Sequence, residues 1–166
     1  MSLKDTMQQI KIETILEVYE NLNQLPDNIR YIMSKAIEAR ESAYAPYSNF
    51  NVGAAILLDN GEIVIGSNQE NASYPSGLCA ERTAIYYAGA QFPNVKMKIM
   101  ALTASSKNQL TNKPIPPCGA CRQAIAEYEI RQEQPIEIYF MGAEGKVVKS
   151  QSLVNLLPLV FENSVL

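Results

Sequence analysis

The sequence predicts an α/β fold, a three-layer α/β/α sandwich around a five-stranded mixed sheet. Helical and strand patterns alternate along the 166 residues. The expected order is two helices, two strands, helix, strand, helix, two strands and a short helix. Val52–Leu58 is apolar almost throughout, which is typical of a strand that is covered on both faces. The length suits one domain with a well-covered core.

The N-terminal part is expected to hold two helices that pack against the domain and contribute no catalytic residues. Apolar residues recur at helical spacing over Ile10–Leu25, so we interpret residues 1–27 as a helical extension packed on a single domain at 28–166. Pro26-Asp27-Asn28 interrupts this pattern and caps a second helix, Asn28–Ser42.

Turn signals and apolar runs place the remaining elements. Asp59-Asn60-Gly61 is a hairpin signal that joins the strand Val52–Leu58 to a second strand, Glu62–Gly66. The later elements are helix Leu78–Ala90, strand Met97–Ala104, helix Cys118–Ile130, strands Pro135–Met141 and Lys146–Lys149, and a short helix within Ser152–Leu157.

Composition narrows the class of protein. The chain is 47% hydrophobic and 19% charged, as in ordinary soluble domains, and its net charge is -3. It lacks the basic cluster of a nucleic-acid-binding protein, so we expect no nucleic-acid partner. No apolar run approaches the roughly 20 residues of a membrane span, and Met1–Gln9 lacks the apolar run of a signal peptide. Three cysteines favour reduced thiols, hence a cytoplasmic protein.

All three cysteines fall in two short segments. Cys79 is followed by Ala80 and Glu81, and Cys118 and Cys121 belong to Pro-Cys-Gly-Ala-Cys. Three thiolates suit tetrahedral Zn2+ and leave a fourth position open for water. The chain contains no histidine, so the Cys and His residues of one copy cannot supply all four ligands of a zinc ion. Glu81 is therefore either a fourth ligand or a proton carrier beside bound water.

Other interpretations of the cysteines stay open. A free cysteine is often a small buried hydrophobe, and Cys-x-x-Cys can be a redox pair. The proline before Cys118 and the Cys-Ala-Glu sequence at Cys79 favour metal. Both segments are expected at helix N-termini, where the helix dipole favours thiolate. Arg82 is either a surface charge or a counterweight to the negative charge of three thiolates on zinc.

The loop Ser67–Gly77 leads directly into Cys79. Its polar composition is that of a solvated surface connection. Its amide, carboxylate and tyrosine side chains also suit the hydroxyl groups of a sugar, and its position before Cys79 favours this second interpretation.

These segments resemble the small, homotetrameric class of cytidine deaminases, from about Ala36 to the C-terminus. Cys-x-Glu with Pro-Cys-x-x-Cys marks the wider superfamily of zinc deaminases. Asn68 with Glu70 narrows the resemblance to deaminases that act on nucleosides. Gln69, Asn51 and the extension Met1–Asp27 depart from the family pattern. The matching segments are 44–55, 68–75, 79–85, 117–123 and 156–161.

The resemblance implies hydrolytic deamination of cytidine and 2′-deoxycytidine with release of ammonia, in pyrimidine salvage, by a homotetramer that shares its pockets between subunits. Alternatives are another zinc deaminase, acting on a free base, an aminonucleoside or a polynucleotide, and a non-catalytic zinc or redox module. The implied roles are zinc binding by Cys79, Cys118 and Cys121, proton transfer by Glu81, contact of the Ala80 N–H with the pyrimidine O2, ribose binding by Asn68 and Glu70, stacking on the base by Phe50, and contributions from a neighbouring subunit by Tyr74 and Phe161.

Overall fold

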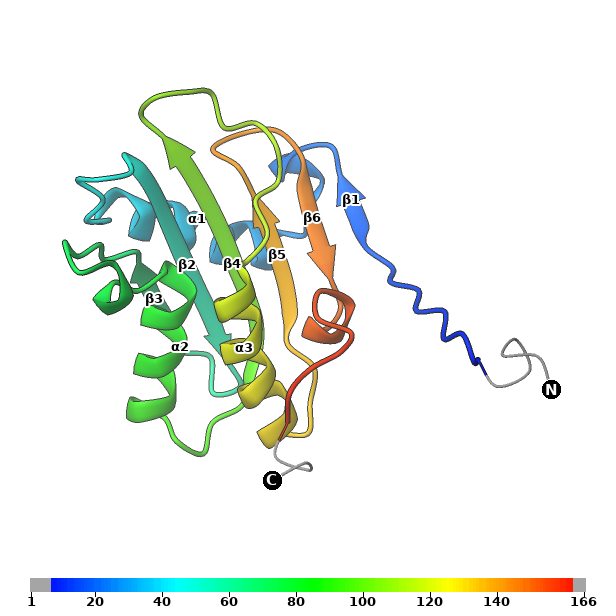
Figure 1. Cartoon of the computed structure of the whole chain (residues 1–166). Helices are drawn as coiled ribbons and strands as arrows, with labels where there is room; N and C mark the ends of the chain where they lie inside the picture. The colour runs from blue at the N-terminus through cyan, green and yellow to red at the C-terminus, as the bar shows by residue number, and fades with distance from the viewer. Residues whose placement is uncertain (1–6, 163–166) are drawn as a thin grey trace.

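One mixed sheet organises the protein, as Figure 1 shows. A computed structural model describes residues 7–162. Within this range six strands lie in the order β1-β6-β5-β4-β2-β3, of which β4 and β5 form the parallel pair. The strands are β1 (Glu17–Tyr19), β2 (Phe50–Leu58), β3 (Ile63–Ser67), β4 (Met97–Ser106), β5 (Glu137–Met141) and β6 (Val147–Ser150). The helices are α1 (Asp27–Glu41), α2 (Ala80–Gln91) and α3 (Gly119–Arg131), with 3-10 turns η2 (Leu22–Gln24), η3 (Tyr74–Ser76) and η4 (Leu153–Asn155).

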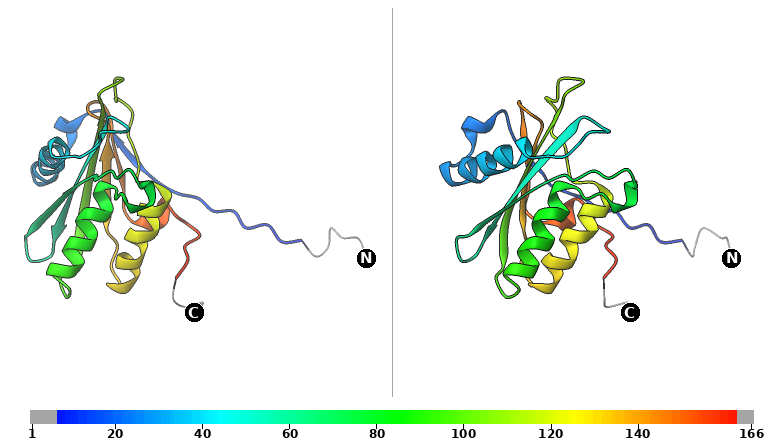
Figure 2. Two further views of the ribbon diagram at one scale, coloured as in Figure 1. Left: turned by 60° about the vertical axis from the view of Figure 1, so that its left-hand side comes forward. Right: turned by 90° about the vertical axis from the view of Figure 1, so that its left-hand side faces the viewer.

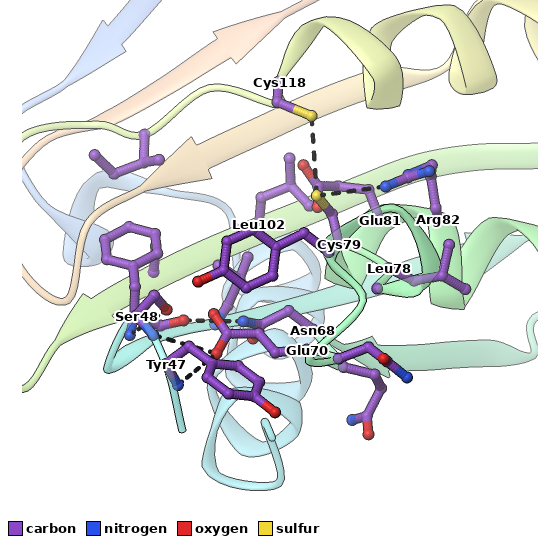
Figure 3. Close-up of a pocket in the computed structure, with 18 of the residues that line it drawn as sticks. Tyr47, Ser48, Asn68, Glu70, Leu78, Cys79, Glu81, Arg82, Leu102 and Cys118 are labelled. Carbon is purple, nitrogen blue, oxygen red and sulfur yellow. Dashed lines mark hydrogen bonds between the residues drawn. The ribbon is translucent and has the colours of Figure 1, made fainter. Parts of the chain in front are cut away.

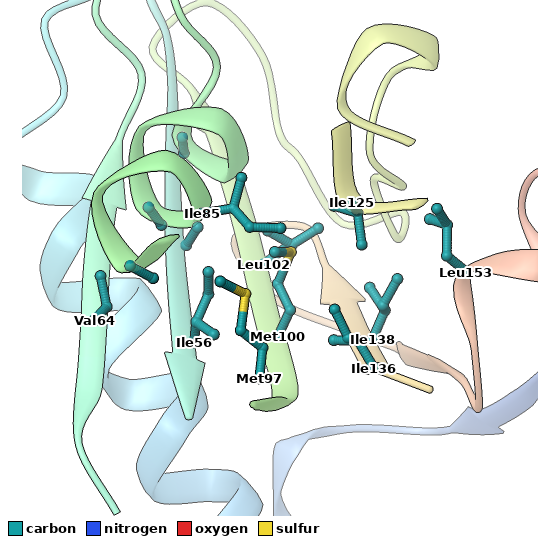
Figure 4. Close-up of a cluster of buried hydrophobic side chains, with 14 of the residues drawn as sticks. Ile56, Val64, Ile85, Met97, Met100, Leu102, Ile125, Ile136, Ile138 and Leu153 are labelled. Carbon is teal, nitrogen blue, oxygen red and sulfur yellow. The ribbon is translucent and has the colours of Figure 1, made fainter. Parts of the chain in front are cut away.

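Helices cover both faces of the sheet, so the predicted three-layer sandwich is confirmed (Figure 2). Helix α1 packs Ile32 and Met33 on one face, and α2 and α3 pack Ile85 and Ile125 on the other (Figure 4). All four side chains are buried, and burial of one such side chain contributes about 1.5–3 kcal/mol. The strand Val52–Leu58 was expected to be covered on both faces, and its residues contribute to both clusters.

Two glycines in the sheet allow the helices to approach closely. A Cβ atom on Gly53 would lie 2.0 Å from the carbonyl oxygen of Ala36 in α1. A Cβ atom on Gly66 would lie 2.6 Å from the backbone nitrogen of Ala84 in α2. Any side chain at either position would push the helix away from the sheet. Gly66 therefore sets the distance between the sheet and α2, whose first turn carries Glu81.

The helix predicted over Ile10–Leu25 is wrong. Residues 7–16 have no regular structure, β1 pairs with β6 through Val18 and Val148, and a single 3-10 turn follows. β-branched side chains favour extended backbone, and β6 offers a sheet edge that a helix cannot use. The β-branched residues of this segment are Ile10, Ile12, Thr14, Ile15 and Val18.

This difference changes two predictions. The sheet has six strands where five were expected, because β1 adds to β6. The described part of the 1–27 extension has no α-helix before α1, and only Tyr19, Leu22 and Leu25 in it reach the core of the domain; residues 1–6 lie outside the described range.

The other predicted elements are confirmed with small shifts at their ends. The short helix expected within Ser152–Leu157 is one 3-10 turn, capped where the Ser152 side chain accepts a hydrogen bond from the Val154 N–H. Among the described residues, no helix has both the length and the apolar character needed to cross a bilayer.

Candidate metal centre and active site

The N-termini of α2 and α3 bring the three cysteines together. Cys79 precedes the first residue of α2, Cys118 precedes the first residue of α3, and Cys121 lies in the first turn of α3. The Sγ atoms of Cys118 and Cys121 are 3.4 Å apart, and those of Cys79 and Cys118 are 3.9 Å apart. Sulfurs bound to one tetrahedral zinc at 2.3 Å are separated by about 3.8 Å. The cluster therefore fits a single ion.

The Cys79 thiol is acidic. Its pKa is lowered from 9.0 to about 5, because the Cys121 thiol donates a hydrogen bond to it and the Arg82 guanidinium lies 4.0 Å from its Sγ atom. Donation of this hydrogen bond, together with burial, raises the pKa of Cys121. The cluster thus holds one thiolate near neutral pH, and a metal ion would displace the remaining thiol protons.

Glu81 lies beside the sulfurs in the first turn of α2. Its side chain is buried, and burial raises its pKa to about 7. Within residues 7–162, its Oε2 atom has no hydrogen-bond partner. A buried acceptor left unpaired costs about 1–3 kcal/mol of stability. This oxygen is therefore available to accept a hydrogen bond or a proton from a bound ligand. The donor set and this unpaired oxygen together fit a zinc ion with an open position.

A cavity of about 660 Å³ opens in front of Glu81 and the sulfurs (Figure 3). Its volume suits a small organic ligand. Cys79, Glu81 and Cys118 form one end of the cavity, and the polar loop that includes Asn68 and Glu70 forms another part of its wall. The other lining residues are Tyr47, Ser48, Phe50, Val52, Gln69, Asn71, Tyr74, Gly77, Leu78, Arg82, Leu102, Thr103, Ala104, Ile115 and Pro116.

Asn68 clamps the polar loop to β2. Its Oδ1 atom accepts a hydrogen bond from the Val52 N–H at 2.8 Å, and its Nδ2 atom donates to the Phe50 carbonyl at 2.9 Å. The amide therefore fixes the start of β2, where the Phe50 ring joins the wall of the cavity. An amide oxygen and an NH2 group each retain capacity for one more hydrogen bond, so Asn68 can also meet a ligand.

Glu70 holds the loop that precedes β2. Its Oε2 atom accepts from the backbone N–H groups of Tyr47 at 2.9 Å and Ser48 at 3.2 Å. The Ser48 side chain and these two N–H groups lower the pKa of Glu70, so the side chain is a carboxylate at neutral pH. A carboxylate has about four acceptor sites, which leaves capacity for hydroxyl groups of a ligand.

Most of the predicted site residues line this one cavity. Cys121 lies behind it, in contact with Cys118, and Ala80 is buried at the start of α2. Phe161 is not among the lining residues; it is 61% exposed, and its carbonyl accepts from the Gln123 side chain. Tyr74, expected to come from a neighbouring subunit, lines the cavity of its own chain. The lining residues among the predicted set are Phe50, Asn68, Glu70, Tyr74, Cys79, Glu81, Arg82 and Cys118.

Several lining residues were not predicted. Leu102 and Thr103 come from β4, and Ile115 and Pro116 come from the loop before Cys118. Leu102 is one of many apolar strand residues, and nothing in its local sequence separates it from the core. Tyr47 and Ser48 stood inside a segment already matched to the family, and that match is the signal that would have found them.

The comparison with protein families decides the assignment. A family model described as the cytidine and deoxycytidylate deaminase zinc-binding region matches residues 26–134. The chain belongs to this family. The matched range contains the three cysteines and Glu81, and family membership makes the chain a zinc-dependent hydrolytic deaminase.

Individual deaminases support the same assignment. A cytidine deaminase of Halalkalibacterium halodurans is 46% identical over 96 residues, which cover 58% of this chain and 68% of that protein. One of Sporosarcina psychrophila is 37% identical over 134 residues, which cover 81% of this chain and 91% of that protein. The crystal structure of cytidine deaminase from Burkholderia pseudomallei matches with a TM-score of 0.69 at 36% identity, over 82% of this chain and all of that one.

Proposed function

We propose that this protein converts cytidine and 2′-deoxycytidine to uridine and 2′-deoxyuridine, with release of ammonia. The observation that carries the proposal is the composition of the cavity. Cys79, Cys118 and the buried Glu81 lie at one end, with the Cys121 sulfur clustered behind them, and Asn68 and Glu70 lie in the polar wall. The first set suits hydrolysis at an exocyclic amine, and the second set suits the hydroxyl groups of a sugar.

Cys79, Cys118 and Cys121 would hold the zinc ion. When bound, zinc lowers the pKa of a water molecule and so makes a nucleophile available at neutral pH. Three thiolates would leave a net negative charge at this centre. The Arg82 guanidinium, 4.0 Å from the Cys79 sulfur, and the N-termini of α2 and α3 offset that charge.

Glu81 would carry the proton. Its pKa of about 7 allows the same carboxyl group to accept and return a proton near neutral pH. In the proposed reaction Glu81 takes one proton from the attacking water and delivers it to N3 of the pyrimidine ring, which makes C4 electrophilic, and the water oxygen bonds to C4. Glu81 then takes the second proton of that oxygen and gives it to the exocyclic amine. The C4–N bond breaks, ammonia leaves, and the oxygen remains as the C4 carbonyl of uridine. The unpaired Oε2 atom is the atom that we assign to this transfer.

Asn68 and Glu70 would fix the sugar, so that C4 of the base arrives at the end of the cavity that holds Glu81. Phe50 would stack on the base, and the backbone N–H of Ala80 would donate to the pyrimidine O2. Holding the substrate in this way lowers the barrier, because the reacting groups are already oriented.

We further infer a cytoplasmic homotetramer that acts in pyrimidine salvage and whose pockets are completed by neighbouring subunits. Tyr74 is 75% exposed at the edge of the cavity, and Phe161 is 61% exposed on the C-terminal segment. Large aromatic side chains on a free surface are typical of residues that meet a partner.

A substrate panel tests the assignment of the substrate. Zinc-loaded protein is incubated with cytidine, 2′-deoxycytidine, cytosine and adenosine, and the ultraviolet absorbance of each is followed. We expect turnover of both cytosine nucleosides and little change in the free base or adenosine. Turnover of cytosine at the rate of cytidine would contradict the role given to Asn68 and Glu70. The same panel is then run with Asn68→Ala and, as its matched control, with Asn94→Ala, which lies outside the cavity.

A further inference from the structure

The N-terminal segment leaves the domain as an extended arm (Figures 1 and 2). We define the arm as residues 7–18; every one of them is exposed. Ile10 is 88% exposed and Ile15 is 79% exposed. Ile12, Leu16 and Val18 are also exposed, and in an extended strand their side chains share one face with that of Ile10. An exposed apolar row of this kind is typical of a surface that another molecule covers.

The arm continues a free sheet edge. Strand β1 pairs with β6 on one side and is the outermost strand of the described sheet. Residues 7–16 extend the line of β1 backwards from Glu17 and join none of the strands found within residues 7–162. The unpaired N–H and C=O groups of an edge strand are a template for another strand.

The sequence of the arm is complementary to itself. In an antiparallel pair of two arms with a two-fold axis at Thr14, Ile12 of one copy lies opposite Leu16 of the other. Ile10 then lies opposite Val18, and all four apolar residues share one face, because side chains alternate along a strand. Such opposed apolar pairs stabilise a two-stranded ladder.

Charges favour the same register. With the axis at Thr14, Lys11 lies opposite Glu17 of the second copy, a favourable cross-strand pair. Moving the axis to Ile15 would place Glu13 opposite Glu17, two like charges. Moving it to Ile12 would leave Val18 without an apolar partner among the described residues. Thr14 is therefore the axis that matches both the apolar and the charged positions.

We propose that the arm binds the arm of a second copy of this chain, as an antiparallel strand pair centred on Thr14 that continues the sheet beyond β1. The partner is a second copy, because this register pairs the apolar and the charged residues of both strands at once. A two-fold contact requires the same surface on each subunit. This contact lies outside the family-matched range 26–134, so it adds to any assembly made by the domain itself.

Cysteine cross-linking tests the register in the full-length, zinc-loaded protein. In Thr14→Cys the two new thiols would face each other across the axis, with Cα atoms about 5 Å apart, which suits a disulfide. In the matched control Ile10→Cys, the two thiols would be offset by eight positions, about 26 Å along the strand. Both positions are exposed, so both variants keep the domain intact. Mild oxidation and a non-reducing gel measure the yield of covalent dimer, with the wild type as the control for the native cysteines.

We expect Thr14→Cys to give mostly covalent dimer, and Ile10→Cys and the wild type to give little. Adding Ile12→Asp to Thr14→Cys should reduce the yield about tenfold, because each of two symmetric apolar pairs is replaced by a charge. Failure of Thr14→Cys to cross-link would overturn the proposal, and would indicate an arm that docks on its own domain or on the body of a neighbour. Equal yields from positions 10 and 14 would also overturn it, since they indicate random collision. Neither result depends on deaminase activity.

Discussion

The sulfur atoms of Cys79 and Cys118 lie 3.9 Å apart, although 39 residues separate them in the sequence. The contact exists because α2 and α3 pack side by side on one face of the sheet and begin at the same end. Both helix N-termini favour negative charge at this point. The cysteine cluster therefore depends on the packing of the two helices on the sheet, and no single loop forms it.

Loss of one sulfur should release the metal. Cys118→Ala leaves two thiolates, too few for a stable zinc site in this chain, which has no histidine. We expect zinc content to fall from about one ion per chain by at least about tenfold. Atomic absorption measures it. Because bound zinc stabilises the folded state by mass action, a chelator should lower the Tm of the wild type and leave that of Cys118→Ala unchanged; an equal drop in both would argue against the site.

Asn68→Ala should weaken both the fold and the binding of nucleoside. It removes two hydrogen bonds to the backbone of β2 and leaves the Val52 N–H without its partner, at a cost of about 1–3 kcal/mol. Urea unfolding measures the loss of stability, and steady-state kinetics should show a larger rise in KM than fall in kcat. Asn94→Ala, exposed and remote from the cavity, is expected to change neither quantity.

Gly53→Ala should destabilise the protein by about 2 kcal/mol or more, since the new methyl group would lie 2.0 Å from the Ala36 carbonyl oxygen and α1 would have to move. Gly119→Ala is the matched change, because a Cβ atom there has no neighbour within 4 Å. In the first turn of α3, alanine is expected to be neutral or slightly stabilising. Similar midpoints of thermal unfolding for the two variants would show that α1 has room to move.

The contribution of Glu70 to stability should depend on pH. Its pKa is lowered in the folded protein from the ordinary value of 4.5, by the Ser48 side chain and by backbone N–H groups. The stabilisation is therefore present above the ordinary pKa and is lost as the pH falls through the lowered value. We expect the stability difference between wild type and Glu70→Gln to shrink from about pH 6 to below about pH 4. A difference that grows towards acid pH would mean that the carboxylate is not held by these hydrogen bonds.

Local patterns in the sequence were sufficient for the parts of the fold that short segments specify. The apolar run in β2 indicated burial on both faces, and the cysteine segments indicated two helix starts that share an ion. The family resemblance supplied Asn68 and Glu70, whose side chains line the same cavity as Cys79.

The remaining features depend on neighbours distant in the sequence. Ile12, Ile15 and Leu16 fit a helical stripe as well as an exposed arm, and it is the edge of β6 that draws Glu17–Tyr19 into the sheet. In the same way, Leu102 lines the cavity only because the fold brings β4 next to the segments that carry Cys79 and Cys118.

The release of ammonia from cytidine by the wild type and by Glu81→Gln, with zinc content measured in both, tests the central claim most directly. We predict that the zinc-loaded wild type releases one ammonia per cytidine consumed. Glu81→Gln should keep its zinc while kcat falls by about 10²- to 10⁴-fold, because amide and carboxyl groups have the same shape but the amide cannot carry the proton. Near-normal turnover by the zinc-loaded variant, or no ammonia from the zinc-loaded wild type, would contradict the account.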